Sequence, residues 1–380
     1  MIFKEICFFI YDKSVMEKAI NYLCHVNWKT NIFKDNGLII KKGWVNGLHI
    51  KIIVSSDNIN NLERMEFIVH SYLENLRDEL MKNNVEEIDY DKFENVVNNL
   101  AILENYKGEY LPLAAQFSIS SNEYNHQSGM KDAKIGIKEE EILTELFLEV
   151  GSYYYHLTSE QRLIFLLKLF TILGDYKSLS SKSTIQPINE SYLSYKSHLE
   201  GFKQQIKHYP FETRKKILNN LEVKNQVEEE FINENFGEFL NHYRNDFKNY
   251  EEIDKGYLIY YLNAVKELDA LYYVGLKNNQ ITFNQGQSIS QFYEDNTDLS
   301  EFHKSINEHV NLDFYNTEEV LLGRLLVNWF YTLLPLFSAS VLTKNKLCNL
   351  VCRGVERVEN KNYLELIKDF SETLDGGIRT

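Results

Sequence analysis

Residues 37–55 read GLIIKKGWVNGLHIKIIVS, and this stretch decides how the rest of the chain is interpreted. Positions 38–42 and 48–54 have the aliphatic and β-branched composition of β-strands. Gly43 and Gly47 flank residues 44–46, and glycines are common in tight turns. The stretch therefore predicts a β-hairpin.

The second strand of this hairpin carries two ionisable side chains on one face. Side chains alternate along a strand, so His49 and Lys51 lie on the same side as Ile53, and apolar residues fill the other side. An imidazole and an ammonium held side by side can transfer protons or bind an anion. The same pattern also fits a half-buried hairpin whose polar face only meets solvent.

The first 137 residues are expected to mix strands with helices. Apolar residues recur with a period of two or at helical spacing, and turn-forming residues separate these segments. The predicted elements are strand 2–11, helix 15–25, the hairpin, helix 59–81, helix 91–104, and a loop at 105–137 containing a short strand at 116–120. Long loops often carry function, which draws attention to Tyr110, Tyr124 and His126.

The remaining residues, 138–380, show helical periodicity almost throughout. The predicted helices are 139–155, 159–173, 190–207, 211–250, 255–274, 288–293, 299–310, 317–337, 343–358 and 363–374. We therefore predict an α+β protein with a small sheet layer in residues 1–137 and a helical portion in residues 138–380, packed as one compact domain.

The predicted helix 317–337 contains a second group of polar residues. Arg324, Asn328 and Tyr331 are spaced i, i+4, i+7 and share one face of an otherwise apolar helix. Such side chains need hydrogen-bond partners if they are buried. These three side chains fit either a solvent-exposed face of the helix or a charged face that borders an internal cleft.

Composition excludes several classes of function. The formal net charge of −14 opposes binding to nucleic acid, and the longest apolar run is interrupted by polar residues and a proline, so no membrane span is expected. The N-terminus lacks the features of a signal peptide, and four cysteines without a repeating framework suit a reducing compartment. No phosphate loop, dinucleotide fingerprint, zinc motif or nucleophile elbow occurs. We expect a cytoplasmic protein.

Stretches far apart in sequence resemble one protein family. Residues 39–53, IIKKGWVNGLHIKII, resemble the strand–turn–strand segment "FIRY…GPHLRLR" in the carboxy-terminal domain of lantibiotic dehydratases. Residues 325–356, LLVNWFYTLLPLFSASVLTKNKLCNLVCRGVE, resemble the terminal helix pair of that group, above all in its stand-alone thiopeptide-type enzymes. Residues 157–169, LTSEQRLIFLLKL, are similar to a helix between them.

The resemblance implies modification of a ribosomally made peptide by one of two reactions. In the first, a glutamylated serine or threonine loses glutamate by β-elimination. In the second, two dehydroalanines of a thiopeptide precursor undergo a formal cycloaddition, and loss of water and of the leader peptide leaves a pyridine that closes a macrocycle. Neither reaction is expected to need a metal or organic cofactor.

Departures from the eliminating members favour the pyridine-forming branch. Their strand pair carries arginines where this chain has lysine or isoleucine, at Lys41 or Lys42, Lys51 and Ile53. Their terminal "HMHxNR" motif is matched here only at its asparagine, Asn328. The other motif positions hold Arg324, Leu326 and Trp329. The missing histidines remove a proton carrier that titrates near neutrality, which glutamate elimination is expected to need.

On this resemblance we expect His49, Lys51 and Arg324 to be catalytic. His49 would move protons, while Lys51 and Arg324 would stabilise negative charge on amide oxygens. The expected substrate-binding residues are Lys42, Trp44, Tyr110, Asn328 and Tyr331. The leader peptide would bind the first α+β layer by strand addition or helix docking, and other maturation enzymes are further expected partners.

Two other functions fit the same residues. One is a glutamate-eliminating subunit of a split dehydratase. The other is a non-catalytic subunit that binds the precursor peptide and presents it to partner enzymes.

Overall fold

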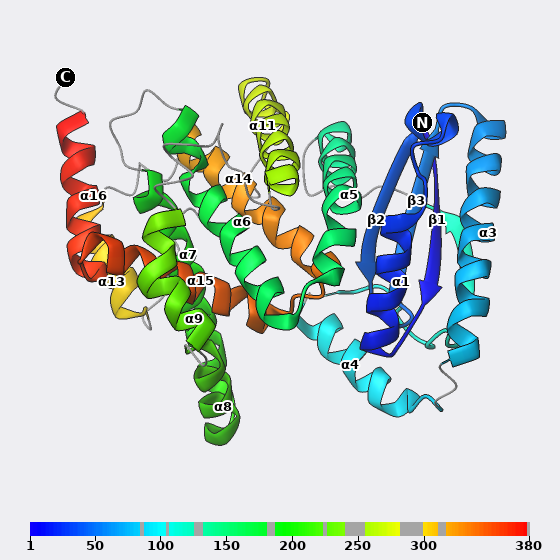
Figure 1. Cartoon of the computed structure of the whole chain (residues 1–380), viewed down its shortest axis with the longest axis horizontal. Helices are drawn as coiled ribbons and strands as arrows, with labels where there is room; N and C mark the ends of the chain where they lie inside the picture. The colour runs from blue at the N-terminus through cyan, green and yellow to red at the C-terminus, as the bar shows by residue number, and fades with distance from the viewer. Residues whose placement is uncertain are drawn as a thin grey trace. The chain divides into compact units, whose positions relative to one another are not determined.

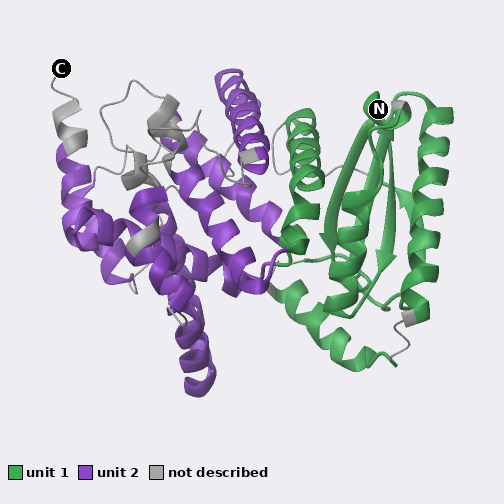
Figure 2. Cartoon of the chain, in the orientation of Figure 1, with its two compact units in different colours: residues 1–156, 335–338 green, residues 157–334, 339–380 purple. Residues whose placement is uncertain are grey.

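The predicted α+β class is confirmed by a computed structural model of the chain (Figure 1). The structure describes residues 1–83, 87–103, 106–124, 132–180, 187–222, 226–239, 255–281, 299–310 and 317–377. The chain divides into two compact units, which Figure 2 colours separately. Unit 1 comprises Met1–His156 with Pro335–Ser338, and unit 2 comprises Leu157–Leu334 with Ala339–Thr380.

Unit 1 is built on an antiparallel sheet, with the order β2-β3-β1-β4 in the described part of the chain. The predicted hairpin forms its β2 and β3 strands, and the N-terminal strand β1 lies at the centre. The strands are β1 (Ile2–Phe9), β2 (Gly37–Gly43), β3 (His49–Ser56) and β4 (Ile119–Glu123). β4 begins three residues later than the strand predicted at 116–120.

The two faces of the sheet follow the alternation read from the sequence. Ile50 and Ile52 on β3 pair with Phe8 and Ile6 on β1, and all four side chains are fully buried. This buried aliphatic and aromatic layer is the core of unit 1, because removing such side chains from water is the main favourable term in folding. His49 and Lys51 lie on the opposite face.

Helices cover the sheet and its β2 edge. α3 packs against β1 and β3, whereas α5 packs against β2 and α1. The helices of unit 1 are α1 (Lys13–His25), α2 (Asn31–Lys34), α3 (Ile59–Asn83), α4 (Tyr90–Leu103) and α5 (Ala133–His156). α5 was expected to belong to the helical portion, but its packing on β2 places it with the sheet. The expected boundary between the α+β portion and the helical portion at residue 137, and their packing as one compact domain, stay predictions.

Residues Pro335–Ser338, from late in the sequence, also belong to unit 1. The 3-10 helix Leu334–Phe337 follows α14 (Glu318–Leu333). The hydroxyl of Tyr154 on α5 donates to the carbonyl of Phe337 at 2.9 Å, and the hydroxyl of Tyr155 donates to the carbonyl of Leu336. These bonds satisfy carbonyls that the ending helix leaves without intrahelical partners.

Unit 2 is helical in its described residues. α7 packs against α6 and α15, and α11 packs against α14. Trp329, Phe330 and Tyr261 are buried between such helices. The remaining elements are α6 (Ser159–Ser180), α7 (Pro187–Gln205), α8 (Phe211–Leu221), α9 (Gln226–Glu230), a π-helical turn (Phe231–Asn235), α11 (Lys255–Lys277), α13 (Glu301–His309), α15 (Val341–Glu359) and α16 (Tyr363–Gly377).

Within the part of the chain that the structure describes, one apolar stretch, Val320–Phe337, is long and hydrophobic enough by composition to cross a membrane. Half of it is buried within the protein, and its largest side chains, Trp329 and Phe330, are completely enclosed. We therefore interpret α14 as a buried core helix. The cytoplasmic location stays a prediction.

The long helix predicted at 211–250 was wrong. α8 ends at Leu221, where Glu222 is extended, and a short helix and the π-helical turn follow after residues 223–225. The amide of Asn349 on α15 donates to the Leu221 carbonyl at 2.8 Å and thereby satisfies the end of the helix. The helix predicted at 288–293 lies outside the described residues.

Candidate functional site

His49 sits at the start of β3, directly opposite Gly43 on β2 and Phe9 on β1. Its imidazole is 2% exposed and packs on the Phe9 ring with centroids 5.0 Å apart. A Cβ at Gly43 would lie only 2.2 Å from Nε2 of His49. The glycine in the predicted turn therefore provides the space that the imidazole occupies.

The protonation state of His49 follows from its one hydrogen bond. Its Nδ1 lies 2.8 Å from the Gly47 carbonyl, which can only accept, so Nδ1 carries the proton. Nε2 then holds a lone pair, and no described residue hydrogen-bonds to it. Burial lowers the pKa of His49 to about 4. The ring is neutral near pH 7 and can accept a proton only from a group that reaches into this layer.

Lys51, the second expected catalytic residue, lies in an ion pair. Its Nζ is 2.8 Å from a carboxylate oxygen of Glu5, and both side chains are about four-fifths buried, at 20% and 18% exposure. On β2, directly opposite, Lys41 pairs with Glu140 at 2.9 Å. Both ammonium groups lie against the ring of Tyr124, at 5.5 and 5.7 Å from its centroid. Charge on this face is thus balanced within unit 1.

Lys42 points to the other side of β2 and is placed differently. Its Nζ lies 3.4 Å from the hydroxyl oxygen of Ser338, which is 3.3 Å from the hydroxyl oxygen of Tyr155. Tyr155 already donates its proton to the Leu336 carbonyl, so Ser338 donates to Tyr155 and Lys42 donates to Ser338. Ser338 has a φ of 55°, a left-handed conformation that is uncommon outside glycine.

The charge of Lys42 is destabilised by its surroundings. Burial lowers the pKa of Lys42 to about 8; the carboxylate of Glu17 opposes this shift and the ammonium of Lys13 adds to it. Lys42 therefore exchanges protons close to neutral pH. We call Lys42, Ser338 and Tyr155 the lysine–serine–tyrosine chain. Sequence reasoning included Lys42 but missed Ser338 and Tyr155, because nothing local joins residues so far apart in the chain.

Aromatic side chains gather beside the hairpin turn. The half-buried Trp44 makes edge contacts with Tyr106 and Tyr110, with ring centroids at 5.2 and 6.1 Å. The backbone N–H of Asn46 donates to the carbonyl of Tyr110 at 3.0 Å and holds the two segments together. Trp44 and Tyr110, both expected to bind substrate, therefore share one cluster. His126 lies outside the described residues.

The three residues of α14 that were expected to be functional differ in their exposure to solvent. Arg324 and Asn328 are exposed, whereas Tyr331 is half-buried and its hydroxyl lies 3.5 Å from Cys348 Sγ. The ring of His198 packs edge-on against Tyr331, with centroids 4.8 Å apart, and Lys344 Nζ lies 4.6 Å from the same ring. Burial, then the charges of Lys344 and Arg324, lower the pKa of His198 to about 4. His198 and Lys344 were not expected from the sequence.

The proposed catalytic roles remain predictions. His49 and Lys51 belong to unit 1, and Arg324 belongs to unit 2. Among the described residues, no group of three or more His, Cys, Asp or Glu side chains is arranged to hold a metal ion.

Comparison with known proteins identifies the fold. No protein-family model and no curated protein matches the sequence. Among solved structures, the pyridine synthase TbtD from thiomuracin biosynthesis matches with a TM-score of 0.60 and 13% identity, over 95% of this chain and 99% of TbtD. TsrL matches with a TM-score of 0.63 and 13% identity, over 97% of this chain and 98% of TsrL. The fold of the family suspected from the sequence is thereby confirmed.

Proposed function

We propose that this protein is a thiopeptide pyridine synthase. It would join two dehydroalanines of a ribosomal precursor peptide by a formal cycloaddition, with loss of water and of the leader peptide. The observation that carries the proposal is the agreement in fold with a pyridine synthase over nearly the full length of both chains. The missing terminal histidine motif, with Arg324 and Leu326 in its place, agrees with this branch of chemistry.

The reaction requires proton transfer at an amide. The amide nitrogen of one residue must lose its proton while its oxygen gains one, which gives an azadiene. Two carbon–carbon bonds to the second dehydroalanine then close the ring. The new hydroxyl leaves as water, and the leader leaves with its amide nitrogen, so the ring becomes aromatic. The enzyme must supply an acid, a base and a surface that holds planar azoles in place.

The lysine–serine–tyrosine chain suits the proton transfer better than His49. Lys42 has a pKa of about 8, so a fraction of it is neutral at physiological pH and can accept a proton, whereas its charged form can donate one. Ser338 lies within reach of Lys42 and can pass a proton onward. His49 is neutral, enclosed and a weak base, and Lys51 is paired with Glu5. We therefore assign proton transfer to Lys42 and Ser338.

The aromatic cluster is the proposed platform for the substrate. Trp44 and Tyr110 can stack on thiazole-type rings, because offset and edge-to-face contacts between aromatic groups are favourable. Arg324, expected to stabilise negative charge on amide oxygens, and Asn328, expected to bind substrate, are exposed on unit 2 and keep these roles as predictions.

Mass spectrometry of a dehydrated, azole-bearing precursor after incubation with the enzyme tests the proposal. A macrocyclic product together with released leader supports it. Loss of glutamate from a glutamylated precursor would instead identify an eliminating dehydratase subunit. Binding of the precursor without a change in mass would identify a presenting subunit.

Single variants test the assignment of residues. Lys42→Met and Ser338→Ala should each lower turnover by about 100-fold, the lower end for a general acid or base. Lys215→Met, which removes an exposed lysine from α8, is the matched control. Full turnover in both test variants would overturn the assignment of Lys42 and Ser338 and leave the reaction class untouched.

A further inference from the structure

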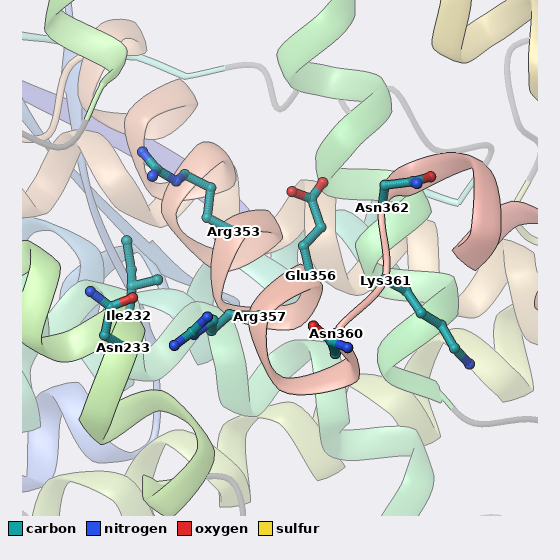
Figure 3. Close-up of a pocket in the computed structure, with 8 residues that line it drawn as sticks. All are labelled: Ile232, Asn233, Arg353, Glu356, Arg357, Asn360, Lys361 and Asn362. Atoms are coloured by element: carbon teal, nitrogen blue, oxygen red, sulfur yellow. The ribbon is translucent and has the colours of Figure 1, made fainter.

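A recess of about 510 Å³ lies in unit 2 at the junction of α15 and α16. α15 contributes Arg353, Glu356 and Arg357, and the π-helical turn contributes Ile232 and Asn233 (Figure 3). Asn360, Lys361 and Asn362 of the connection complete the lining. This volume falls within the range of about 300–1,000 Å³ that is usual for ligand pockets. We call it the Arg357 recess.

The recess is positively charged on a protein whose formal net charge is −14. Its lining holds three cations and one carboxylate. That carboxylate, Glu356, is already engaged, because it accepts from the hydroxyl of Tyr192 at 2.6 Å and lies 3.4 Å from Nζ of Lys196. Glu222 and Asp369 pair with two of the three cations, so the attraction for an anionic ligand rests on Arg357 and on how readily those exposed pairs exchange partners.

The three cations differ in whether a carboxylate already pairs with them. Arg353 lies 3.6 Å from Glu222 and Lys361 lies 2.5 Å from Asp369, and all four of these side chains are at least 40% exposed. Such exposed ion pairs contribute little stability and can exchange partners at small cost. Arg357 makes no side-chain hydrogen bond or ion pair with the described residues, and its guanidinium lies on the side of the recess near Asn233 (Figure 3).

Backbone N–H groups at the junction of α15 and α16 are already hydrogen-bonded within the protein. Asn362 caps α16 by accepting from the N–H groups of Leu364 and Glu365, and the Glu365 side chain accepts from the Asn362 N–H. The N–H groups of Leu364 and Glu365 in the first turn of α16 are thereby used. Recognition in the recess thus falls to side chains, namely guanidinium and ammonium groups for carboxylates, and asparagine amides for peptide bonds.

We infer that the Arg357 recess binds an acidic segment of a peptide. Guanidinium groups match the two oxygens of a carboxylate in a bidentate pair, and three cations can hold neighbouring aspartate or glutamate side chains. The asparagines, which both donate and accept, suit the main chain between those side chains. This inference does not depend on the proposed reaction.

Fluorescence anisotropy with synthetic peptides tests the inference on the full-length protein. The probe carries an uncharged dye and four consecutive glutamates between glycines, and its control has glutamine in place of every glutamate. The glutamate peptide should bind, more weakly as salt is raised, and the glutamine peptide should not. Arg357→Gln should weaken binding about tenfold, whereas Lys215→Gln, with the same change in net charge, should leave it unchanged. Equal thermal unfolding of the two variants establishes that both are folded.

Three results would overturn the inference. The first is equal binding of the glutamine peptide. The second is unchanged affinity in both Arg357→Gln and Arg353→Gln. The third is displacement of the peptide by free glutarate, inorganic phosphate or a short oligonucleotide at concentrations similar to that of the peptide, which would assign the recess to a small anion or to nucleic acid.

Discussion

Substitution of Gly43 by alanine should disrupt the strand pair that carries His49. The added Cβ would lie 2.2, 2.6 and 2.9 Å from three atoms of the imidazole, whereas ordinary contacts begin at 3.4 Å. The shortfall is 1.2 Å (3.4 minus 2.2 Å). The ring cannot easily withdraw, because it packs on Phe9 and is held by the Gly47 carbonyl. Overpacking of about 1–3 kcal/mol is offset by about 0.5–1 kcal/mol gained by replacing glycine in a strand. The net loss is therefore up to about 2.5 kcal/mol, and the middles of the two ranges give about 1 kcal/mol.

Hydrogen exchange of peptides covering β2 and β3 measures this loss locally, since amide exchange reports the free energy of opening. Exchange should be faster in Gly43→Ala than in the wild type. The double variant Gly43→Ala/His49→Ala should lose less stability than the sum of the single variants, because the colliding ring is gone. Gly201→Ala is the matched control, since its Cβ meets nothing within 4 Å and alanine should stabilise α7. Unchanged exchange in Gly43→Ala, or strict additivity in the double variant, would refute this account of the packing.

Three further predictions concern the same unit. His49 has a pKa of about 4 in the folded protein against 6.5 ordinarily, so the unfolded chain binds the proton first as the pH falls. Stability should therefore decline from pH 6.5 to about 4, by at most about 3 kcal/mol from this group, and His49→Leu should remove that part of the decline in urea titrations. Reductive methylation followed by mass spectrometry should give Lys42 a midpoint near pH 8; a midpoint near its ordinary value of 10.5 would contradict the assigned burial. Tyr155→Phe should cost about 1–3 kcal/mol by leaving the buried Leu336 carbonyl unpaired, measured as faster exchange in residues 335–338.

Local pattern was sufficient for the two strands of the hairpin. The strands predicted at 38–42 and 48–54 are found as Gly37–Gly43 and His49–Ser56, because alternation fixes which side chains face the core. The end of α8 could not be predicted in the same way. It depends on a hydrogen bond from Asn349, more than a hundred residues later, and no local signal marks it.

The candidate site was only partly accessible from the sequence. His49 and Lys42 could be selected from the sequence as ionisable residues on a hairpin. Their protonation states could not be predicted in this way. The enclosure of His49 depends on Phe9 and Gly43, and the neighbours of Lys42 come from α5 and from the turn after α14. Ser338 and Tyr155 are brought together only by tertiary packing, which sequence spacing does not encode.

The placement of Pro335–Ser338 in unit 1 has a consequence for any attempt to dissect the protein. The polypeptide passes between the units three times, after residues 156, 334 and 338, so neither unit is a continuous gene fragment. Expression of residues 1–156 alone would produce a truncated protein in which Tyr154 and Tyr155 lack their carbonyl acceptors and Lys42 lacks Ser338. An isolated version of unit 1 would have to be engineered by joining the tetrapeptide to its C-terminus through a designed linker.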